Sequence, residues 1–378
     1  MQIEKFKAGQ WIRQYQYKSF SPVFINRQWL INDPDLQTLL AEASRYLGEL
    51  NAFSYQIPDI DFFIRMHIAK EAVTSSRIEG TQTNMEEAFL KENDIQPEKR
   101  DDWQEVQNYI QAMNSAIERL QTLPLSNRLI RETHKTLLAS VRGEHRQPGE
   151  FRKSQNWIGG ASIQDAVFIP PQQDEVPELM SDLEKFLNND QIKIPELLRI
   201  AIAHYQFETI HPFLDGNGRV GRLLITLHLV SNKILERPAL YLSDFFERNK
   251  TLYYDNLMGV RLKNDMRQWL KFFLVGVIKT AKSSIFTFQS IIALKDLCDK
   301  DIVRKLGRRA HKGLALMDWL YCKPLTTAAE VSEWLNVSQP TANTLIRYFC
   351  NLNILQEMTG YKRNRIFVFR RYLEIFKS

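Results

Sequence analysis

The sequence has little cysteine, few chain-breaking residues and no long hydrophobic run. Its three cysteines, Cys298, Cys322 and Cys350, are scattered, which excludes a disulfide framework and a CxxC type of metal site. Glycine and proline make up about 8% of the 378 residues, below the roughly 12% typical of proteins, which favours long helices. No apolar run approaches the ~18–20 residues of a membrane span, and the first residues lack a signal-peptide core. We therefore expect a cytoplasmic, mainly α-helical protein without membrane contact.

Positive charge is concentrated toward the C-terminal end. The whole chain carries a formal charge of +6. Residues 301–378 hold thirteen lysines and arginines against six acidic residues, so this segment accounts for the entire excess. Such a distribution indicates a separate module with an anionic partner.

Hydrophobic periodicity divides the chain into three predicted regions. Residues 1–60 are expected to form an extended arm leading into helix. Apolar residues recurring three and four positions apart predict helices over about 59–92, 101–123, 126–142, 176–188 and 195–209. Residues 143–171 alternate glycine and proline with short apolar stretches, which is typical of a loop with a β-hairpin. The pattern weakens after a helix expected to end about Leu297. We predict an N-terminal helical region over 1–100, a core over 101–297 and a further domain over 298–378.

The segment 211–222, HPFLDGNGRVGR, places several glycines between two apolar helices. Gly216 and Gly218 permit close backbone approach, so successive N–H groups can form an anion-binding nest at the start of the second helix. With Gly221 they also match the GxGxxG dinucleotide fingerprint. That fingerprint needs a preceding strand, whereas residues 195–209 are helical by period. The chain has no GxxxxGK[ST] sequence, which excludes a Walker-type phosphate loop.

The same segment supplies the charged and titratable groups of a polyphosphate site. Arg219 and Arg222 lie three residues apart on one helix face and can bind phosphate. Asp215 offers a hard oxygen ligand for Mg²⁺. His211 is a base that titrates near neutral pH. Together with the glycine nest, these residues predict a polyphosphate site with a base.

With these residues the segment resembles the signature of the Fic family, H-x-F-x-(D/E)-G-N-G-R-x-x-R, at every fixed position. The resemblance implies a helical Fic core that transfers AMP from Mg-ATP to a Ser, Thr or Tyr hydroxyl of a protein. It implies His211 as the general base, Phe213 as the loop anchor and Asp215 as the Mg²⁺ ligand. The nucleotide-binding positions that it implies are Gly216, Asn217, Gly218, Arg219, Val220, Gly221 and Arg222.

The resemblance also gives two other segments a role in the nucleotide site. The expected hairpin lies where the family keeps a flap that pairs with the target segment and presents its hydroxyl to the base. Its residues expected at the nucleotide are Asn156, Trp157, Ile158 and Gly159. Tyr253 and Tyr254 fall where the family places aromatic rings against adenine. From the residues alone, an ordinary surface hairpin and two core tyrosines remain equally open.

An inhibitory motif is expected upstream. Ser75 and Glu79 are four residues apart, share a helix face, and are followed by Gly80. This S-x-x-x-E-G pattern resembles the inhibitory motif of many Fic proteins, and its place N-terminal in the same chain implies intramolecular inhibition. The implied mechanism is a Glu79–Arg222 ion pair that occupies the arginine needed by the γ-phosphate. From the residues alone, a surface glutamate before a glycine C-cap stays an alternative.

The C-terminal residues show the order helix, helix, helix, hairpin. The helices are expected at His311–Tyr321, Thr326–Leu335 and Ser338–Leu352. This order resembles a winged helix-turn-helix with the third helix as recognition helix. The side chains that could reach DNA are Gln339, Thr341, Asn343 and Arg347 on that helix and Lys362, Arg363 and Arg365 on the wing. DNA contact through residues 338–365 and docking of a protein both stay open.

We therefore expect a mainly α fold with a Fic-type helical core, a small β-hairpin flap and a C-terminal winged helix-turn-helix. The expected function is a protein adenylyltransferase, dependent on Mg²⁺ and ATP and inhibited by Glu79. Two others stay open: a DNA-binding regulator with a nucleotide-sensing core, and a Fic enzyme that transfers or removes another phosphate-containing group. The target protein, self-modification and a homodimer are undecided. His204 is expected to be a hydrogen-bonded structural residue, because no third ligand lies at metal spacing.

Overall fold

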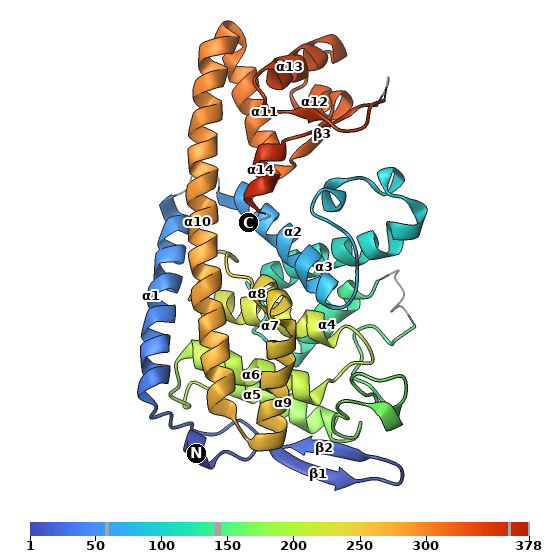
Figure 1. The fold of residues 1–378 in the computed structure, drawn as a ribbon, viewed down its shortest axis with the longest axis vertical. Coiled ribbons are helices and arrows are strands. Elements are labelled where there is room, and N and C mark those ends of the chain that lie inside the picture. Colours follow the sequence, from blue (N-terminus) through green and yellow to red (C-terminus); the bar gives the residue numbers. More distant parts are fainter. Residues whose placement is uncertain (57–59, 140–144, 362–363, 377–378) are drawn as a thin grey trace.

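The computed structural model describes residues 1–56, 60–139, 145–361 and 364–376, and most of them are helical (Figure 1). The α-helices are α1 (Pro34–Gln56), α2 (Ile60–Ile78), α3 (Arg100–Arg119), α4 (Asn127–Leu137), α5 (Val176–Asn188), α6 (Glu196–Ile210), α7 (Asn217–Ser231), α8 (Ser243–Arg248), α9 (Lys250–Lys263), α10 (Met266–Leu306), α11 (Ala310–Cys322), α12 (Ala328–Trp334), α13 (Gln339–Asn351) and α14 (Arg370–Ile375). The strands are β1 (Gly9–Arg13), β2 (Lys18–Pro22), β3 (Leu325–Thr327), β4 (Gln356–Glu357) and β5 (Ile366–Val368). The 3₁₀ turns are η1 (Ile3–Lys5), η2 (Glu87–Phe89), η3 (Glu92–Asp94), η4 (Pro97–Lys99), η5 (Ile163–Asp165) and η6 (Gly307–Arg309).

The long helix α10 runs along the whole molecule and connects its two ends (Figure 1). Helix α1 lies beside it and points the same way, because Lys271 bonds Asp35 at 2.7 Å and, further along both helices, Lys282 bonds Glu42 at 3.1 Å. None of the helices in the described part of the chain combines the length and the apolar character needed to cross a membrane.

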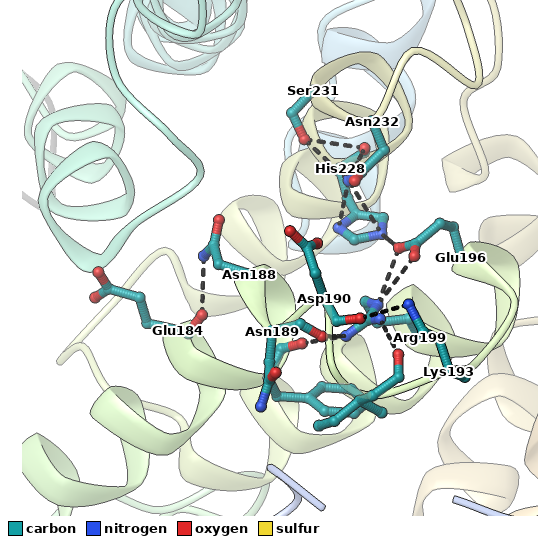
Figure 2. Close-up of polar contacts among 12 residues, drawn as sticks. Glu184, Asn188, Asn189, Asp190, Lys193, Glu196, Arg199, His228, Ser231 and Asn232 are labelled. Carbon is teal, nitrogen blue, oxygen red and sulfur yellow. Dashed lines mark hydrogen bonds and ion pairs between the residues drawn. The ribbon is translucent and has the colours of Figure 1, made fainter. Parts of the chain in front are cut away.

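Helices α6 and α7 form the centre of the fold and position the loop between them. Every residue of α6 after Glu196 is buried, as is nearly all of α7, so neither helix has the one-sided apolar pattern of a surface helix. At the ends remote from that loop, Figure 2 shows Glu196 bonded to both His228 of α7 (2.8 Å) and Arg199 (3.0 Å). The Arg199 guanidinium also donates to the carbonyl oxygens of Phe186 in α5 (2.5 Å) and Ile192 (2.8 Å). This network fixes the ends of three helices relative to one another.

The C-terminal segment forms a compact unit at the far end of α10 (Figure 1). Its three short strands make an antiparallel sheet in the order β3-β5-β4, with α12 packed against β3 and α13 packed against α12. A capping box between Thr327 and Glu330 starts α12. The three helices and the β4–β5 strands occur in the predicted order, with the strand β3 and the helix α14 in addition. The assignment as a winged helix-turn-helix remains a prediction. Lys362 and Arg363 of the expected wing lie outside the described residues.

The sequence located some elements well and missed others. The helices expected at 176–188 and 195–209 are α5 and α6, to within one residue. The extended arm expected over residues 1–60 is wrong, since that region contains the β1–β2 hairpin and the helix α1. The helix expected over 59–92 ends at Ile78, and short 3₁₀ turns follow it.

The helix expected to end about Leu297 continues to Leu306, so the predicted boundary at 297/298 falls inside α10. The reason is packing: Cys298, Ile302 and Leu306, spaced by four, are buried and extend the apolar stripe of the helix. Gly313 of α11 lies against this stripe, because a Cβ there would come within 2.7 Å of Ile302.

Neutral histidines make the fold sensitive to acid. Burial lowers the pKa of five of the seven histidines below the ordinary 6.5. The pKa falls to about 3 for His67, His204 and His211 and to about 4 for His134, and burial lowers that of His228 as well. Between pH 6.5 and these lower values the unfolded chain binds protons that the folded chain does not, so the free energy of unfolding falls as the pH drops. Burial raises the pKa of the carboxyls of Glu71, Asp182 and Glu208, which act in the opposite direction but are fewer.

We predict that the melting temperature falls as the pH is lowered from about 6.5 to about 4.5. His228→Gln, which keeps a donor for Glu196, should reduce the pH slope of the unfolding free energy by up to ~1.4 kcal/mol per pH unit. The matched control is His311→Gln at an exposed position, which should leave the slope unchanged. The measurement is thermal unfolding by circular dichroism at half-unit pH intervals. A melting temperature that stays flat across this range would contradict the prediction.

Candidate active site

The loop between α6 and α7 forms one wall of an open cavity of about 270 Å³. Helix α6 ends at Ile210, and His211 and Gly216 both adopt positive φ angles (49° and 74°), so the chain turns twice before α7 begins. Positive φ is uncommon for a residue other than glycine, and such strain persists where surrounding contacts enforce it. The contacts that enforce it here are hydrogen bonds from four side chains, those of Asn217, His134, Arg152 and Asn156.

The amide of Asn217 and the ring of His134 hold this loop from inside. Asn217 Oδ1 accepts from the N–H of Phe213 and its Nδ2 donates to the Phe213 carbonyl, both at 2.8 Å. The Phe213 ring is fully buried and stacks on His134, with ring centroids 3.7 Å apart. His134 Nδ1 accepts from the N–H of Gly149 (2.8 Å), so its Nε2 carries the proton and donates to the Asp215 carbonyl (3.0 Å). The side chain of Asn217 is thus used within the loop, and only its backbone N–H is left for a ligand.

Arg152 ties the flap segment to the same loop. The guanidinium is 2% exposed and donates only to main-chain carbonyls, among them that of His211 at 3.0 Å. Asn156 Nδ2 donates to the carbonyls of His211 (3.2 Å) and Phe213 (2.9 Å). Both side chains therefore brace the backbone that carries the imidazole.

The flap itself is an irregular loop with one antiparallel bridge, between Ile158 and Phe168, where a longer hairpin was expected. Gly159 next to the bridge has φ 69°, and a Cβ there would lie 2.7 Å from Val167, so this turn requires glycine. Trp157 is 41% exposed at the cavity. The flap thus presents one short edge and one aromatic ring toward the cavity.

The imidazole of His211 is half-buried and neutral at pH 7. Burial lowers its pKa to about 3, with further contributions from the positive charges of Arg261 and Arg152. Its Nδ1 has no hydrogen-bond partner among the residues that the structure describes. A neutral ring can accept a proton, which a cationic one cannot.

Arg222 lies beneath the cavity and is bound by the end of α2. Its Nε donates to Ser75 Oγ (2.8 Å), and its Nη2 donates to the Ser75 carbonyl (2.9 Å) and to Glu79 Oε1 (2.7 Å). Burial would lower the pKa of Arg222, but the Glu79 carboxylate raises it above its ordinary value. Burial would raise the pKa of Glu79, but Arg222 lowers it. The pair is therefore ionised, and Gly80 (φ 111°) ends the helical segment directly after it.

Arg219 is directed away from the cavity. It is 4% exposed, its Nη1 donates to Glu105 of α3 (3.0 Å), and its Nη2 lies 3.7 Å from Asp215 Oδ1. Asp215 itself lines the cavity, with 45% of its side chain exposed and Oδ1 accepting from the N–H of Gly216 at 2.6 Å. Arg219 thus links the loop to α3.

A buried relay positions the two tyrosines. His204 Nδ1 donates to the Gly221 carbonyl (2.9 Å), so its Nε2 accepts from the Tyr253 hydroxyl (2.8 Å). Both ring nitrogens of His204 are hydrogen-bonded, which confirms the expectation of a hydrogen-bonded structural residue. Among the described residues, no group of three or more His, Cys, Asp and Glu side chains could hold a metal ion. Tyr254 is 38% exposed at the cavity, where burial raises its pKa to about 12.

Two charged residues at the cavity were not found from the sequence. Glu208 is buried one turn before His211, its Oε1 has no hydrogen-bond partner among the described residues, and burial raises its pKa to about 7. Arg261 of α9 donates to the Glu208 carbonyl (3.0 Å) and to Thr209 Oγ1 (3.1 Å). Glu208 lies three residues before His211, and this spacing could have indicated it from the sequence. No local pattern marks Arg261, because its partners are more than 50 residues away in the sequence.

The structure brings most of the predicted site residues together. Those that line the cavity are Glu79, Trp157, Ile158, Gly159, His211, Asp215, Gly216, Asn217, Gly218, Arg222, Tyr253 and Tyr254. Those that lie outside the lining are Ser75, Gly80, Asn156, Arg219, Val220 and Gly221. Unpredicted residues that join the lining are Glu208, Leu214, Leu257 and Arg261.

Comparison with known proteins gives matches over the same part of the chain. Residues 37–118 match the family model "Fic/DOC family N-terminal", and residues 124–229 match "Fic/DOC family". A stretch of 142 residues is 34% identical to Protein adenylyltransferase Fic of Culex quinquefasciatus, and one of 144 residues is 33% identical to its namesake in Aedes aegypti. These stretches cover 37% and 38% of this chain but only 25% and 26% of the relatives. The chain thus matches about a quarter of the length of these curated relatives.

Solved structures share the fold at low sequence identity. A Fic family protein from Desulfovibrio desulfuricans G20 is 20% identical, with a TM-score of 0.59 over 91% of this chain and 98% of the other. A Fic domain containing signaling protein from Bacteroides thetaiotaomicron is 19% identical, with a TM-score of 0.53 over 68% of this chain and 97% of the other. The helical architecture is therefore that of Fic proteins.

We predict that Arg152→Lys destabilises the protein by on the order of 2–4 kcal/mol, because lysine cannot donate to several carbonyls in the fixed geometry of the guanidinium fork. The matched control is Arg131→Lys, whose guanidinium is 42% exposed and bonds Gly149 and Glu150 in the same region. This change should cost less than about 1 kcal/mol. Urea unfolding measures both. Equal stability of the two variants would contradict the bracing role of Arg152.

Proposed function

Because this chain belongs to the Fic/DOC family, we propose that it is a protein adenylyltransferase that transfers AMP from Mg-ATP to a Ser, Thr or Tyr hydroxyl of a protein. The observation that carries the proposal is the arrangement of three groups around one cavity: the neutral imidazole of His211, the glycine loop that opens α7, and Arg222. The names of the curated relatives point to the same reaction.

The reaction requires a base for the attacking hydroxyl. It also requires the hydroxyl oxygen, the α-phosphorus and the leaving group to lie in line. In the proposed reaction the target hydroxyl oxygen attacks the α-phosphorus of ATP, the bond to the β-phosphate oxygen breaks, and pyrophosphate leaves. His211 takes the proton of the attacking hydroxyl. The low pKa of the free imidazole makes it a weak base, but the negative charge of a bound triphosphate raises that pKa toward the useful range.

The N-terminus of α7 is suited to bind the phosphate groups of ATP. The first N–H groups of a helix have no intrahelical partner, and the helix dipole favours negative charge there. Gly218 lies in this first turn at the cavity. A Cβ at this position would lie 2.9 Å from Arg222 Nη1, so glycine leaves the space between the backbone and the guanidinium open.

Asp215 fits a role as the Mg²⁺ ligand. Its carboxylate is half-exposed at the cavity, and one oxygen already accepts a backbone N–H, which fixes its orientation. Mg²⁺ in phosphate sites takes one or two carboxylates and completes its shell with phosphate oxygens and water, so one carboxylate is a sufficient protein contribution. Asp215 would hold the ion, which would supply positive charge against the negative charge of the phosphates.

The position of the Glu79 carboxylate supports the proposed inhibition. It neutralises Arg222 and also sits against the first turn of α7, because a Cβ on Gly218 would come within 2.3 Å of Glu79 Oε1. A carboxylate in this place occupies both the cation and the helix N-terminus that a terminal phosphate needs. ATP then has to bind in a pose that leaves its α-phosphorus out of line with the hydroxyl.

We predict that Glu79→Gly increases transfer of label from α-labelled ATP to protein by at least about tenfold, because Arg222 becomes available to phosphate. The double variant Glu79→Gly with His211→Ala should return to background. The matched control is Glu247→Gly, whose partly exposed carboxylate pairs with Arg77 outside the cavity. The measurement is autoradiography of the purified protein and of lysate proteins as acceptors, with Mg²⁺.

Absence of label with Glu79→Gly, both on the purified protein and on lysate proteins, would contradict AMP transfer. Label that appears only with another nucleotide donor would instead support transfer of a different phosphate-containing group. Equal activation by Glu247→Gly would show that the effect does not depend on the pair with Arg222.

A second candidate function, DNA binding, is favoured by one face of α13. Gln339, Asn343 and Arg347 are spaced by four, are exposed, and line an open groove of about 1020 Å³ together with Arg365. Polar side chains on one face of a helix beside basic residues are suited to base edges and phosphates. The other wall of the groove includes Lys91 and Asp94, so a DNA duplex in the groove would have to fit beside these two side chains.

We predict that Arg347→Gln and Arg365→Gln each weaken binding of a fluorescent 25-base-pair duplex and each reduce the salt slope by about 1, if the groove binds DNA. The matched control is Lys300→Gln on α10, outside the groove. Fluorescence anisotropy at several salt concentrations measures this. An unchanged affinity in both arginine variants, or no binding at all, would remove this candidate.

A further inference from the structure

A second cavity, also of about 270 Å³, lies between α2, α8 and the middle of α10. It shares no lining residue with the cavity at His211. Phe376 forms part of its wall, so the cavity lies where the C-terminal unit meets the helical core. Nothing in the proposed AMP transfer uses it.

Three buried polar atoms on its wall lack partners. His67 Nε2, Glu71 Oε2 and the Tyr241 hydroxyl have no hydrogen-bond partner among the described residues, and the three side chains are only 6%, 2% and 7% exposed. Buried polar groups in folded proteins are almost always paired, with protein atoms or with an ordered molecule. Three such groups on one cavity indicate a polar occupant.

The chemistry of these buried groups favours hydrogen-bond donors over acceptors. Glu71 Oε1 already accepts from the hydroxyls of Tyr109 (2.9 Å) and Ser243 (2.5 Å). A proton on this carboxyl therefore belongs on Oε2, and burial raises the pKa of Glu71, which favours that protonated form. Glu71 Oε2 and the Tyr241 hydroxyl are then two neutral donors.

Two lysines add positive charge without a counter-ion. Lys70 and Lys279 line the cavity, and no ion pair within 4 Å joins either of them to a carboxylate in the described part of the chain. Burial lowers the pKa of Lys70 while the charge of Asp244 opposes this, and Lys279 lies 5.9 Å from the centroid of the Phe245 ring. Asp244, the carboxylate beside them, is paired with Arg248 at 3.2 Å. The cavity thus combines two unpaired ammonium groups with neutral donors, which suits an anion.

We propose that this cavity is a binding site for the phosphate group of a small metabolite. Two ammonium groups, a phenol and a carboxylic acid are four donor groups, which suit the three or four oxygens of a phosphate. Helix α2 carries Lys70, Glu71 and, one turn later, Ser75, and Glu79 directly follows its last residue, Ile78. A bound phosphate therefore contacts the helix that holds Arg222.

The test is isothermal titration calorimetry of the full chain with inorganic phosphate at constant ionic strength. The double variant Lys70→Met with Lys279→Met should bind phosphate roughly tenfold or more weakly, because two charge-assisted bonds are lost. Tyr241→Phe removes one donor and keeps the ring, so it should weaken binding several-fold. The matched control is Lys300→Met on the same helix as Lys279, remote from the cavity, and melting curves confirm that each variant is folded.

Loss of affinity in the cavity variants, with Lys300→Met like the wild type, supports the site. Three results overturn it: no phosphate binding by the wild type, full binding by the double variant, which would place phosphate at the loop of His211, or equal loss in Lys300→Met. The proposal and its test are independent of AMP transfer, because no nucleotide and no activity measurement enters the titration.

Discussion

A guanidinium as deeply buried as that of Arg222 has to be neutralised, and the end of α2 supplies the neutralising group. Removal of one partner from a buried pair leaves an uncompensated charge, so Arg222 requires an anion beside it in every state. In this structure that anion is the Glu79 carboxylate, 2.7 Å away. The need for a counter-charge holds α2 against α7, and the proposed inhibition makes the carboxylate of the chain and the phosphate of a ligand alternatives for one position.

The groups around this pair are held rigidly before any ligand arrives. Asn217, His134 and Arg152 each use their side chains on main-chain atoms of the loop that carries His211. At the opposite ends of α6 and α7, Glu196 and Arg199 join the same helices a second time. Groups that are already held in place reduce the loss of entropy that a phosphoryl transfer would otherwise incur at the moment of reaction.

The segment after α2 connects the ion pair to the C-terminal unit. Glu86 bonds Arg370 at 3.2 Å, and Lys91 bonds Glu330 at 3.0 Å. These contacts begin only a few residues after Gly80. A movement of α2 that separated Glu79 from Arg222 would therefore act on the same segment that touches α12 and α14.

Local spacing in the sequence determined the features that depend on neighbours within a few turns. The loop 211–222, the helices on either side of it, and the common face of Ser75 and Glu79 follow from glycine positions and from a period of 3.6. Only tertiary packing decided that Arg219 turns to Glu105, that the Asn217 side chain bonds the backbone of Phe213, and that Arg261 joins the site. Packing also extended α10 to Leu306 and left Glu208 Oε1 without a hydrogen-bond partner among the described residues. The physical reason is the same in each case: the direction of a buried side chain depends on which distant group satisfies its hydrogen bonds and charge, and a short stretch of sequence does not contain that group.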